Sequence, residues 1–313
     1  MNEFPDLEHV DVNTYGIRYS SKGSMTLQMA WQLPALLKAI KQEHHMLDQL
    51  IGTHAIDAVI SDNRFGMWSK KIPAVYMTHQ LMIKAPLLRP LSEKLLHHTH
   101  QKYISKFDEC WIPDISGQHD LAGDLAHKKA CSIPAFFIGP QSRFAAPSPS
   151  PQEKKYKYLF IISGPEPQRS IFEQKVLRQL RSCKGKAIVF SGRPECNKQV
   201  SYQDNVEIYN HMDTQEMQQK MLSSELIICR PGYSSIMDLA ILGLPAVFVP
   251  TPGQTEQEYL AVLHKKRGNY NYVEQKEFTL NKLEKRIKGF SGIKLKTNQN
   301  ILSQRIEHLL ERI

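Results

Sequence analysis

One short stretch combines a cation, a glycine and two hydroxyls between an apolar segment and a predicted helix. It reads Arg230-Pro231-Gly232-Tyr233-Ser234-Ser235. Gly232 is expected to permit a tight turn and Ser234 or Ser235 to cap the helix, whose free N–H groups and positive dipole end attract anions. Arg230 adds a guanidinium suited to phosphate, and Asp238, one turn into the helix, could accept hydrogen bonds from ribose hydroxyls. Taken alone, the pattern fits an ordinary capped strand–turn–helix corner better than a nucleotide site, because helix N-caps of this kind are common.

A second polar loop follows the next apolar run, residues 244–249. The helix predicted after that loop opens with Glu256, Gln257 and Glu258. Because the carboxyl ends of parallel strands share one edge of a sheet, the two loops are expected to lie side by side. That arrangement suits a phosphate and a sugar.

Other loops of the second half follow predicted strands and carry polar or glycine residues. They contribute Ser163, Gly164 and Arg169 in one loop, Gly192 and Arg193 in another, and His211 in a third. A cation is unfavourable at the start of a helix, which favours a functional role for Arg169 over a simple proline-rich turn. A surface turn explains Gly192-Arg193 equally well, and local hydrogen bonding is the simpler role for His211.

Two ionisable residues of the first half also follow apolar strands. Asp62 and His79 stand where an acceptor hydroxyl could be deprotonated, since a carboxylate or an imidazole serves as a general base. The alternative is that Asp62 caps a turn and His79 packs locally.

Strand–helix alternation predicts the elements that position these residues. In the first half the predicted strands are 57–61, 73–78, 109–112 and 135–138, and the helices are 24–51, 86–107 and 117–128. In the second half the strands are 158–163, 187–191, 206–209, 225–229 and 246–250, and the helices are 169–181, 214–223, 234–242 and 256–266. Continuous apolar strands separated by helices are typical of an α/β fold, here two doubly wound, Rossmann-like domains with parallel sheets.

A proline-rich segment divides the chain of 313 residues nearly in half. Residues 145–155 alternate proline with small residues and end in charged residues, which is typical of an extended linker. The predicted domains are therefore 1–144 and 156–313, and a last helix near 298–313 is expected to cross back or to pack on the linker.

Composition excludes several classes of protein. The net charge is +9, most of it in the second half, yet no zinc finger, aromatic RNA-binding motif or arginine-rich run points to nucleic acid. The longest apolar runs fall far short of the roughly 18 residues that a membrane span needs, and the acidic start does not resemble a signal peptide. Five scattered cysteines, Cys110, Cys131, Cys183, Cys196 and Cys229, indicate a reducing cytoplasmic setting. No Asp-X-Asp metal motif occurs, and neither a metal nor a cofactor is expected.

The stretch from Leu226 to Ala261 resembles the C-terminal donor domain of GT-B-fold glycosyltransferases, especially the MurG-like enzymes that transfer N-acetylglucosamine from UDP. The residues that carry the resemblance are Arg230-Pro231-Gly232, Asp238, Gly243-Leu244-Pro245, Val247–Pro250 and Gln257-Glu258-Tyr259. The resemblance implies that the turn and helix start hold the diphosphate, that Asp238 binds ribose and that Gln257 reads the donor sugar. Glu258 stands where close relatives carry a second glutamine, which leaves the sugar open.

The same resemblance assigns roles to the other loops. It places Ser163 and Gly164 near the diphosphate or the acceptor, and Gly192, Arg193 and His211 near the base. It implies metal-independent, inverting transfer of a hexose or N-acetylhexosamine to a hydroxyl acceptor, in bacterial envelope or glycolipid biosynthesis. A lipid-linked acceptor and peripheral membrane contact through residues 84–106 belong to this expectation, with an ordinary amphipathic helix over the sheet as the alternative.

The first half departs from the family. No glycine-rich turn with a catalytic histidine opens the chain, so the first βα unit of the family's N-terminal domain is expected to be missing, through a misassigned start, a truncation or a degenerate relative. Two alternatives to transfer therefore stay open: a non-hydrolysing UDP-sugar epimerase and a non-catalytic nucleotide-sugar-binding protein.

Overall fold

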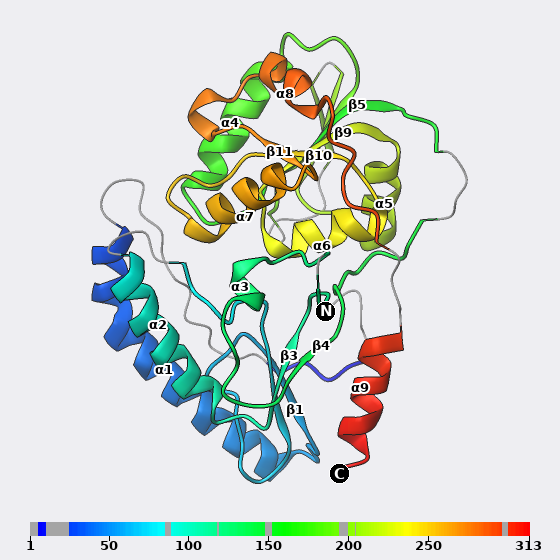
Figure 1. Cartoon of the computed structure of the whole chain (residues 1–313). Helices are drawn as coiled ribbons and strands as arrows, with labels where there is room; N and C mark the ends of the chain where they lie inside the picture. Colours follow the sequence, from blue (N-terminus) through cyan, green and yellow to red (C-terminus); the bar gives the residue numbers. More distant parts are fainter. Residues whose placement is uncertain are drawn as a thin grey trace. The chain divides into compact units, whose positions relative to one another are not determined.

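The chain forms two compact α/β units. The computed structural model describes residues 6–10, 25–84, 89–117, 119–147, 152–193, 200–203, 205–295 and 300–313. Unit 1 contains the described residues up to Pro140 together with the C-terminal helix α9 (Asn300–Leu310). Unit 2 spans Gln141–Lys296. Both units are visible in Figure 1 as sheets flanked by helices.

Unit 1 is built on a parallel sheet of four strands in the order β1-β2-β3-β4. The strands are β1 (Val59–Asp62), β2 (Ala74–Met77), β3 (Glu109–Ile112) and β4 (Ala135–Phe137), and the helices before α9 are α1 (Met25–Thr53), α2 (Arg89–Ile104) and α3 (Asp124–His127). The predicted parallel sheet is confirmed. The helix predicted over 117–128 is wrong, because only its last turn is helical.

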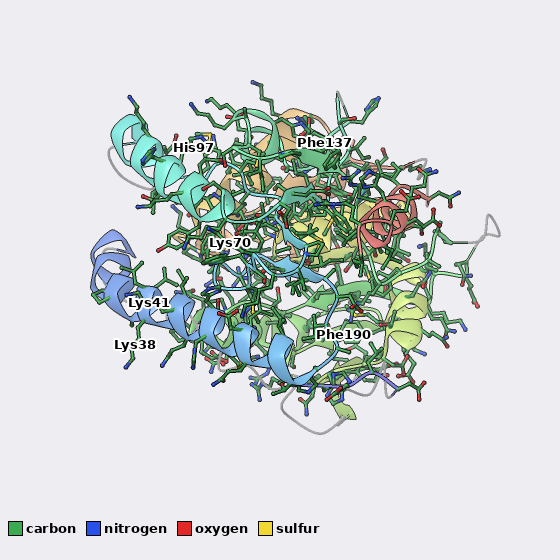
Figure 2. All side chains as sticks on the ribbon, turned by 90° about the horizontal axis from the view of Figure 1, so that it is seen from below. Lys38, Lys41, Lys70, His97, Phe137 and Phe190 are labelled. Carbon is green, nitrogen blue, oxygen red and sulfur yellow. The ribbon has the colours of Figure 1, made fainter. Side chains whose placement is uncertain are left out.

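Helix α1 is amphipathic, as its apolar spacing predicts. Ile40 and Leu47 are buried, whereas Lys38 and Lys41 are exposed and project away from the unit, as Figure 2 shows. The inner side of α1 is tied to the loop after β1, where the Glu43 carboxylate accepts bonds from the Arg64 guanidinium.

Helix α9 packs on the sheet of unit 1. Its Leu309 joins the core cluster of Val75, Trp111 and Ile138. The Glu109 carboxylate, at the start of β3, accepts bonds from Arg305 at 3.2 Å and from Arg312 at 2.8 Å.

The domain boundaries therefore differ from those predicted at both ends of the second domain. The division falls after Pro140 rather than at 144, because Gln141, Ser142 and Arg143 bond to residues of unit 2. The last helix belongs to unit 1 because its apolar side and its arginines find partners there. Residues 148–151 of the predicted linker lie outside the described residues.

Unit 2 carries a seven-stranded sheet in the order β11-β10-β9-β5-β6-β8-β7. The strands are β5 (Tyr156–Ile161), β6 (Ala187–Phe190), β7 (Val200–Gln203), β8 (Val206–Tyr209), β9 (Ser224–Cys229), β10 (Ala246–Phe248) and β11 (Asn271–Tyr272). The helices are α4 (Gln168–Leu180), α5 (Thr214–Leu222), α6 (Tyr233–Leu242), α7 (Thr255–Lys266) and α8 (Leu280–Ile287), with a 3-10 turn η1 (Gln275–Glu277). All described pairings are parallel except that of β7 with β8.

The central strands of unit 2 are buried on both faces. Successive side chains of a strand point to opposite faces, and in β5 Tyr158 and Phe160 join one cluster with Phe172 of α4 and Leu283 of α8. Leu159, between them, is equally buried toward the other face. Burial on both faces explains why the strands are continuously apolar, and the predicted α/β class is confirmed.

Candidate functional site

A cavity of about 410 Å³ opens at the carboxyl edge of the unit 2 sheet, beside the start of α6. Four predicted residues line it: Ser163, Ser234, Ser235 and Asp238. The remaining lining residues are Gln141, Arg143, Ile161, Met217, Met221, Cys229 and Leu239. Loops after β5 and β9 thus meet at one site, as the parallel topology requires.

The start of α6 leaves backbone donors without helical partners. Gly232 is the N-cap residue, the helix begins at Tyr233, and among the described residues no side chain caps it. The prediction that Ser234 or Ser235 caps the helix is therefore wrong. Instead both serines sit in the first turn and line the cavity, where N–H groups that have no acceptor within the helix, together with the helix dipole, favour an anion. The Tyr233 side chain is buried in the core.

The turn before α6 does not require the conformational freedom of glycine at Gly232. Its backbone has φ −70° and ψ 145°, which any residue can adopt. A Cβ added to Gly232 would meet no heavy atom within 4 Å. The glycine therefore leaves open space in front of the α6 N-terminus, and the fold itself does not demand it.

Asp238 is held at the cavity wall by the segment that enters unit 2. Its carboxylate accepts a hydrogen bond from the Ser142 hydroxyl at 2.6 Å. Burial raises the pKa of Asp238, while the Ser142 bond and the nearby Arg143 charge oppose that rise. A carboxylate so placed can accept bonds from neighbouring hydroxyls of a ligand.

Arg143 is a cavity residue that was not predicted from the sequence. It lines the same cavity as Asp238 and Ser163. Its guanidinium contacts the Met217 sulfur and lies over the Phe144 ring, and within the described part of the chain it makes no ion pair. No local pattern marks it, because its place in the cavity depends on how residues 141–144 pack on α5 and α6.

Arg230 does not point to a ligand, contrary to the prediction. Its side chain is fully buried and donates to the carbonyls of Val249 and Gln168 and to the Gln275 side chain. It also stacks over the Phe172 ring at 4.3 Å. Burial lowers the pKa of Arg230 to about 10. Arg230 therefore ties together the segments that carry Gln168, Val249 and Gln275.

Arg169 and Arg193 likewise belong to an ion-pair network. The Glu173 carboxylate accepts bonds from Arg169 at 3.2 Å and from Arg193 at 2.7 Å, and Glu166 pairs with Arg169. Arg169 also donates to the Ser191 carbonyl. The unfavourable cation at the start of α4 is thus neutralised by carboxylates. The predicted donor-binding role of both arginines is not supported by these contacts.

Two of the predicted glycines are required by the backbone. Gly164 has φ +104° and Gly192 has φ +61°, in the region that favours glycine. A Cβ on Gly192 would lie 2.2 Å from the Ile162 carbonyl oxygen. These glycines shape the loops after β5 and β6. His211, half-buried after β8, does not line the cavity.

Side chains at the start of α7 bond to the backbone of the loop that precedes the helix. Gln257 is buried, and its side-chain oxygen accepts a bond from the Thr251 N–H at 2.8 Å. Glu258 accepts a bond from the Gly253 N–H and lines a second cavity, of about 460 Å³, with Tyr272. Glu256 lines neither cavity. Glu256, Gln257 and Glu258, which were predicted to act together, therefore do not line one cavity.

The two predicted general bases of unit 1 occupy adjacent strand ends. Asp62, the last residue of β1, is exposed, and His79, which follows β2, is half-buried. Asn63 between them has φ +55°, and its side chain accepts bonds from Tyr76 and Thr78. The structure thus brings both residues to the carboxyl edge of the sheet.

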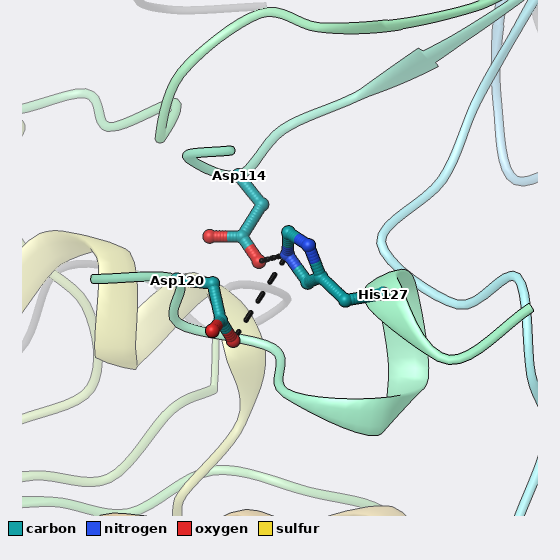
Figure 3. Close-up of side chains that lie close together, drawn as sticks. All are labelled: Asp114, Asp120 and His127. Carbon is teal, nitrogen blue, oxygen red and sulfur yellow. Dashed lines mark hydrogen bonds and ion pairs between the residues drawn. The ribbon is translucent and has the colours of Figure 1, made fainter. Parts of the chain in front are cut away.

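A carboxylate–histidine cluster follows β3 in unit 1 and was not predicted. Asp114 is fully buried, and one of its oxygens lies 3.0 Å from His127 Nε2 (Figure 3). Asp120 lies 4.0 Å from the same nitrogen. The Asp114 oxygens also accept bonds from the N–H groups of Leu121 and Ala122. Because these donors already occupy the carboxylate, Asp114 holds the loop and orients His127 instead of offering a free metal ligand.

No helix in the described ranges combines the length and hydropathy that crossing a membrane requires.

Comparison with known proteins identifies the domain that carries the cavity. Residues 152–308 match the model of the glycosyltransferase family 28 C-terminal domain. The chain is also similar to UDP-N-acetylglucosamine–N-acetylmuramyl-(pentapeptide) pyrophosphoryl-undecaprenol N-acetylglucosamine transferases. The one from Haemophilus ducreyi is 36% identical over 81 residues, which are 26% of this chain and 22% of the relative. The one from Caldanaerobacter subterraneus is 30% identical over 88 residues, 27% and 23% of the two chains. The matched stretches thus span about a quarter of these relatives.

Solved structures show the same fold at low sequence identity. The kitacinnamycin glycotransferase superposes with a TM-score of 0.58 and 13% identity, covering 92% of this chain and 83% of that one. The calicheamicin glycosyltransferase CalG4 gives a TM-score of 0.52 and 12% identity, covering 93% of this chain and 82% of that one.

The family model spans half of the chain and includes every lining residue of the cavity except Gln141 and Arg143. The chain belongs to the family defined by the glycosyltransferase family 28 C-terminal domain.

Proposed function

We propose that this protein transfers a hexose or N-acetylhexosamine from a UDP-linked donor to a hydroxyl acceptor. The observation that carries the proposal is the convergence of three groups on one cavity: the α6 N-terminus, the Arg143 guanidinium and the Asp238 carboxylate. The first two suit a diphosphate and the third suits a ribose. The enzymes named above as relatives use UDP-N-acetylglucosamine, which favours uracil as the base.

The proposed chemistry is direct displacement at the anomeric carbon, with inversion. As the bond to the sugar breaks, negative charge grows on the departing diphosphate. The N–H groups of Ser234 and Ser235, with Arg143, would stabilise that charge by preorganised electrostatics without requiring a metal ion.

The acceptor hydroxyl needs a base, and unit 1 offers three candidates. Asp62 and His79 are those predicted from the sequence. His127 joins them, because Asp114 holds its Nε2 and leaves Nδ1 to accept a proton. A hydroxyl on a lipid-linked acceptor, reached from the cytoplasmic side of a membrane by peripheral contact, is the proposed co-substrate, since the relatives act on an undecaprenol-linked sugar.

Calorimetric titration of UDP, with GDP as the competing nucleotide, tests the donor site. Wild type is expected to bind UDP, and Asp238→Ala is expected to weaken binding by about tenfold or more, the loss of one or two good hydrogen bonds. Glu258→Gln is the matched control, because Glu258 lines the other cavity. Absence of UDP binding by folded wild type would overturn the proposal, and UDP binding without any sugar turnover would favour the non-catalytic alternative.

A further inference from the structure

Helix α5 contributes an apolar wall to the cavity beside α6 through two methionines. Met217 and Met221 are buried in unit 2, and both line that cavity. Methionine side chains are unbranched and adaptable, and a helix of nine residues is marginal in water without tertiary contacts. The position of this wall therefore depends on what else holds α5.

Two contacts connect α5 to the segment that enters unit 2. The Arg143 guanidinium lies 2.7 Å from the Met217 sulfur, and the Gln218 side-chain amide donates to the Ala145 carbonyl at 2.8 Å. A displacement of α5 would therefore displace Arg143, the residue proposed above to contact the diphosphate.

Lys220 joins α5 to the sheet through a cluster of polar side chains. Its ammonium donates to the Tyr156 hydroxyl at 2.7 Å and to the Glu207 carboxylate at 3.0 Å. The same carboxylate accepts bonds from the hydroxyls of Tyr156 and Tyr209, at 3.0 Å and 2.7 Å. The ammonium also lies 4.7 Å and 5.5 Å from the centroids of these two rings. The cluster thus fastens α5 to β5 and β8.

The cluster is shielded enough for its charges to matter. The side chains of Lys220 and Glu207 are 24% and 20% exposed, and both tyrosines are buried. Charged hydrogen bonds are stronger where solvent is partly excluded. Burial raises the pKa of Glu207, but the bonds from Tyr209 and Lys220 outweigh that effect and the pKa is lowered overall. The ion pair therefore persists at neutral pH.

The two ends of α5 have their own supports. The Asp213 side chain caps the start of the helix by accepting a bond from the Glu216 N–H at 2.8 Å. At the other end the Lys154 ammonium donates to the Leu222 and Ser224 carbonyls. The helix should therefore stay folded when the bonds in its middle are removed, and only its position should change.

We propose that Lys220 is a positioning residue for nucleotide binding. It stands three residues after Met217 and directly before Met221, so the bonds of its ammonium fix both cavity methionines. Through Met217 they also fix Arg143 at the cavity wall. This inference rests on the proposed function, because it takes the ligand of the cavity to be UDP.

Calorimetric titration of UDP into the full chain tests the effect on binding. Lys220→Leu removes the ammonium and is expected to weaken UDP binding about fivefold. Lys220→Arg keeps a cation that can reach Glu207 and should restore most of the affinity. Lys184→Leu, at an exposed lysine of the same unit, is the matched control and should bind as wild type does. Equal affinity of Lys220→Leu and wild type would overturn the proposal.

NMR of protein labelled with ¹³C-methyl methionine tests the position of α5 without any nucleotide. In Lys220→Leu the methyl signals of Met217 and Met221 should shift, whereas that of Met82, buried in unit 1, should not. Tyr209→Phe removes only one hydroxyl and should shift the same two signals less, which keeps the test available if Lys220→Leu does not fold. Unchanged signals would overturn this inference whatever the nucleotide affinity, whereas absence of UDP binding by wild type would be a failure of the proposed function.

A double-mutant cycle tests whether Lys220 acts through Arg143. If it does, Lys220→Leu combined with Arg143→Gln should bind UDP only about as weakly as Arg143→Gln alone. A residue with a merely structural role would lower the free energy of unfolding and leave the UDP affinity of the folded protein unchanged. Losses of affinity that multiply in the double variant would overturn the route through Arg143.

Discussion

The Ser142 hydroxyl donates to the Asp238 carboxylate at 2.6 Å, and so couples the segment that enters unit 2 to the first turns of α6. The two residues are 96 positions apart. This bond keeps the carboxylate at the cavity wall and favours its ionised form, which opposes the effect of burial.

Loss of that bond should make ribose binding more sensitive to acid. An ionised Asp238 accepts two hydroxyl donors, and its pKa lies above the ordinary 3.8, so affinity for uridine should fall as the pH drops and should do so before an ordinary aspartate would protonate. Ser142→Ala removes a bond that lowers the pKa and should move the midpoint to higher pH. NMR titration with uridine, which has no phosphate to titrate, measures it. An unchanged midpoint would exclude Asp238 as the ribose ligand.

Mutation of Arg143 should affect UDP binding, whereas mutation of Arg230 should affect the free energy of unfolding. Arg143→Gln should weaken UDP binding by about tenfold or more while leaving the unfolding free energy nearly unchanged, because its side chain is exposed and forms no described ion pair. Arg230→Gln should instead destabilise unit 2 by about 2–3 kcal/mol, because buried acceptors lose their donor. Calorimetry and urea unfolding on both variants separate the two roles.

Gly232 and Gly192 form a second contrasting pair. Gly232→Ala should fold normally, since its Cβ has open space, yet weaken UDP binding where the ligand must approach the helix start. Gly192→Ala should cost at least about 2 kcal/mol, from positive φ and contact with the Ile162 carbonyl. Thermal unfolding and UDP titration of the two proteins check this. A destabilised Gly232→Ala would show that the turn itself needs glycine.

His100 should make unit 1 sensitive to acid. Burial lowers the pKa of this histidine to about 4, from an ordinary 6.5. Because the folded pKa is depressed, its contribution is intact above pH 6.5 and is lost as the pH falls toward 4. The loss at pH 5 relative to pH 7.5 is about 2 kcal/mol.

His100→Leu should remove most of that pH dependence from urea unfolding curves. His98→Leu, on the exposed side of the same helix, is the control and should retain it. If the free energy of unfolding depends on pH equally in both variants, groups other than His100 cause that dependence.

Glu109 should hold α9 in place. Burial raises its pKa, but bonds from Arg305 and Trp111 outweigh that effect, and the pKa is lowered overall. Glu109→Ala would leave two arginines without their carboxylate and should destabilise the docking of α9 by about 3 kcal/mol. Hydrogen exchange across residues 300–310 reads this out. Glu307→Ala, on the exposed face of α9, should leave exchange there unchanged.

Much of the fold could be predicted because its signals are local. Strands such as β5 and β9 are continuous apolar runs, and helices such as α6 follow them at once, so alternation alone indicates a parallel α/β sheet. The short strands β7 and β11 were not predicted, because so few residues carry too little periodicity, and helix α8 was not predicted although Leu280, Leu283 and Ile287 stand at helical spacing. The helix predicted over residues 117–128 is mostly a loop, because the Asp114 carboxylate accepts bonds from the N–H groups of Leu121 and Ala122.

Part of the candidate site could likewise be predicted from local sequence, and part could not. Gly232, Ser234, Ser235 and Asp238 are one segment, so their spacing alone determined that a helix N-terminus and a carboxylate share a site. Which arginine joins them was decided only by tertiary structure. A guanidinium becomes structural or available according to the acceptors that packing brings to it. Arg230 donates to carbonyls of neighbouring loops, whereas Arg143 reaches the cavity from the segment at the start of unit 2. Packing likewise decided between the two positions predicted for the last helix: α9 crosses back, because Leu309, Arg305 and Arg312 find their partners in unit 1.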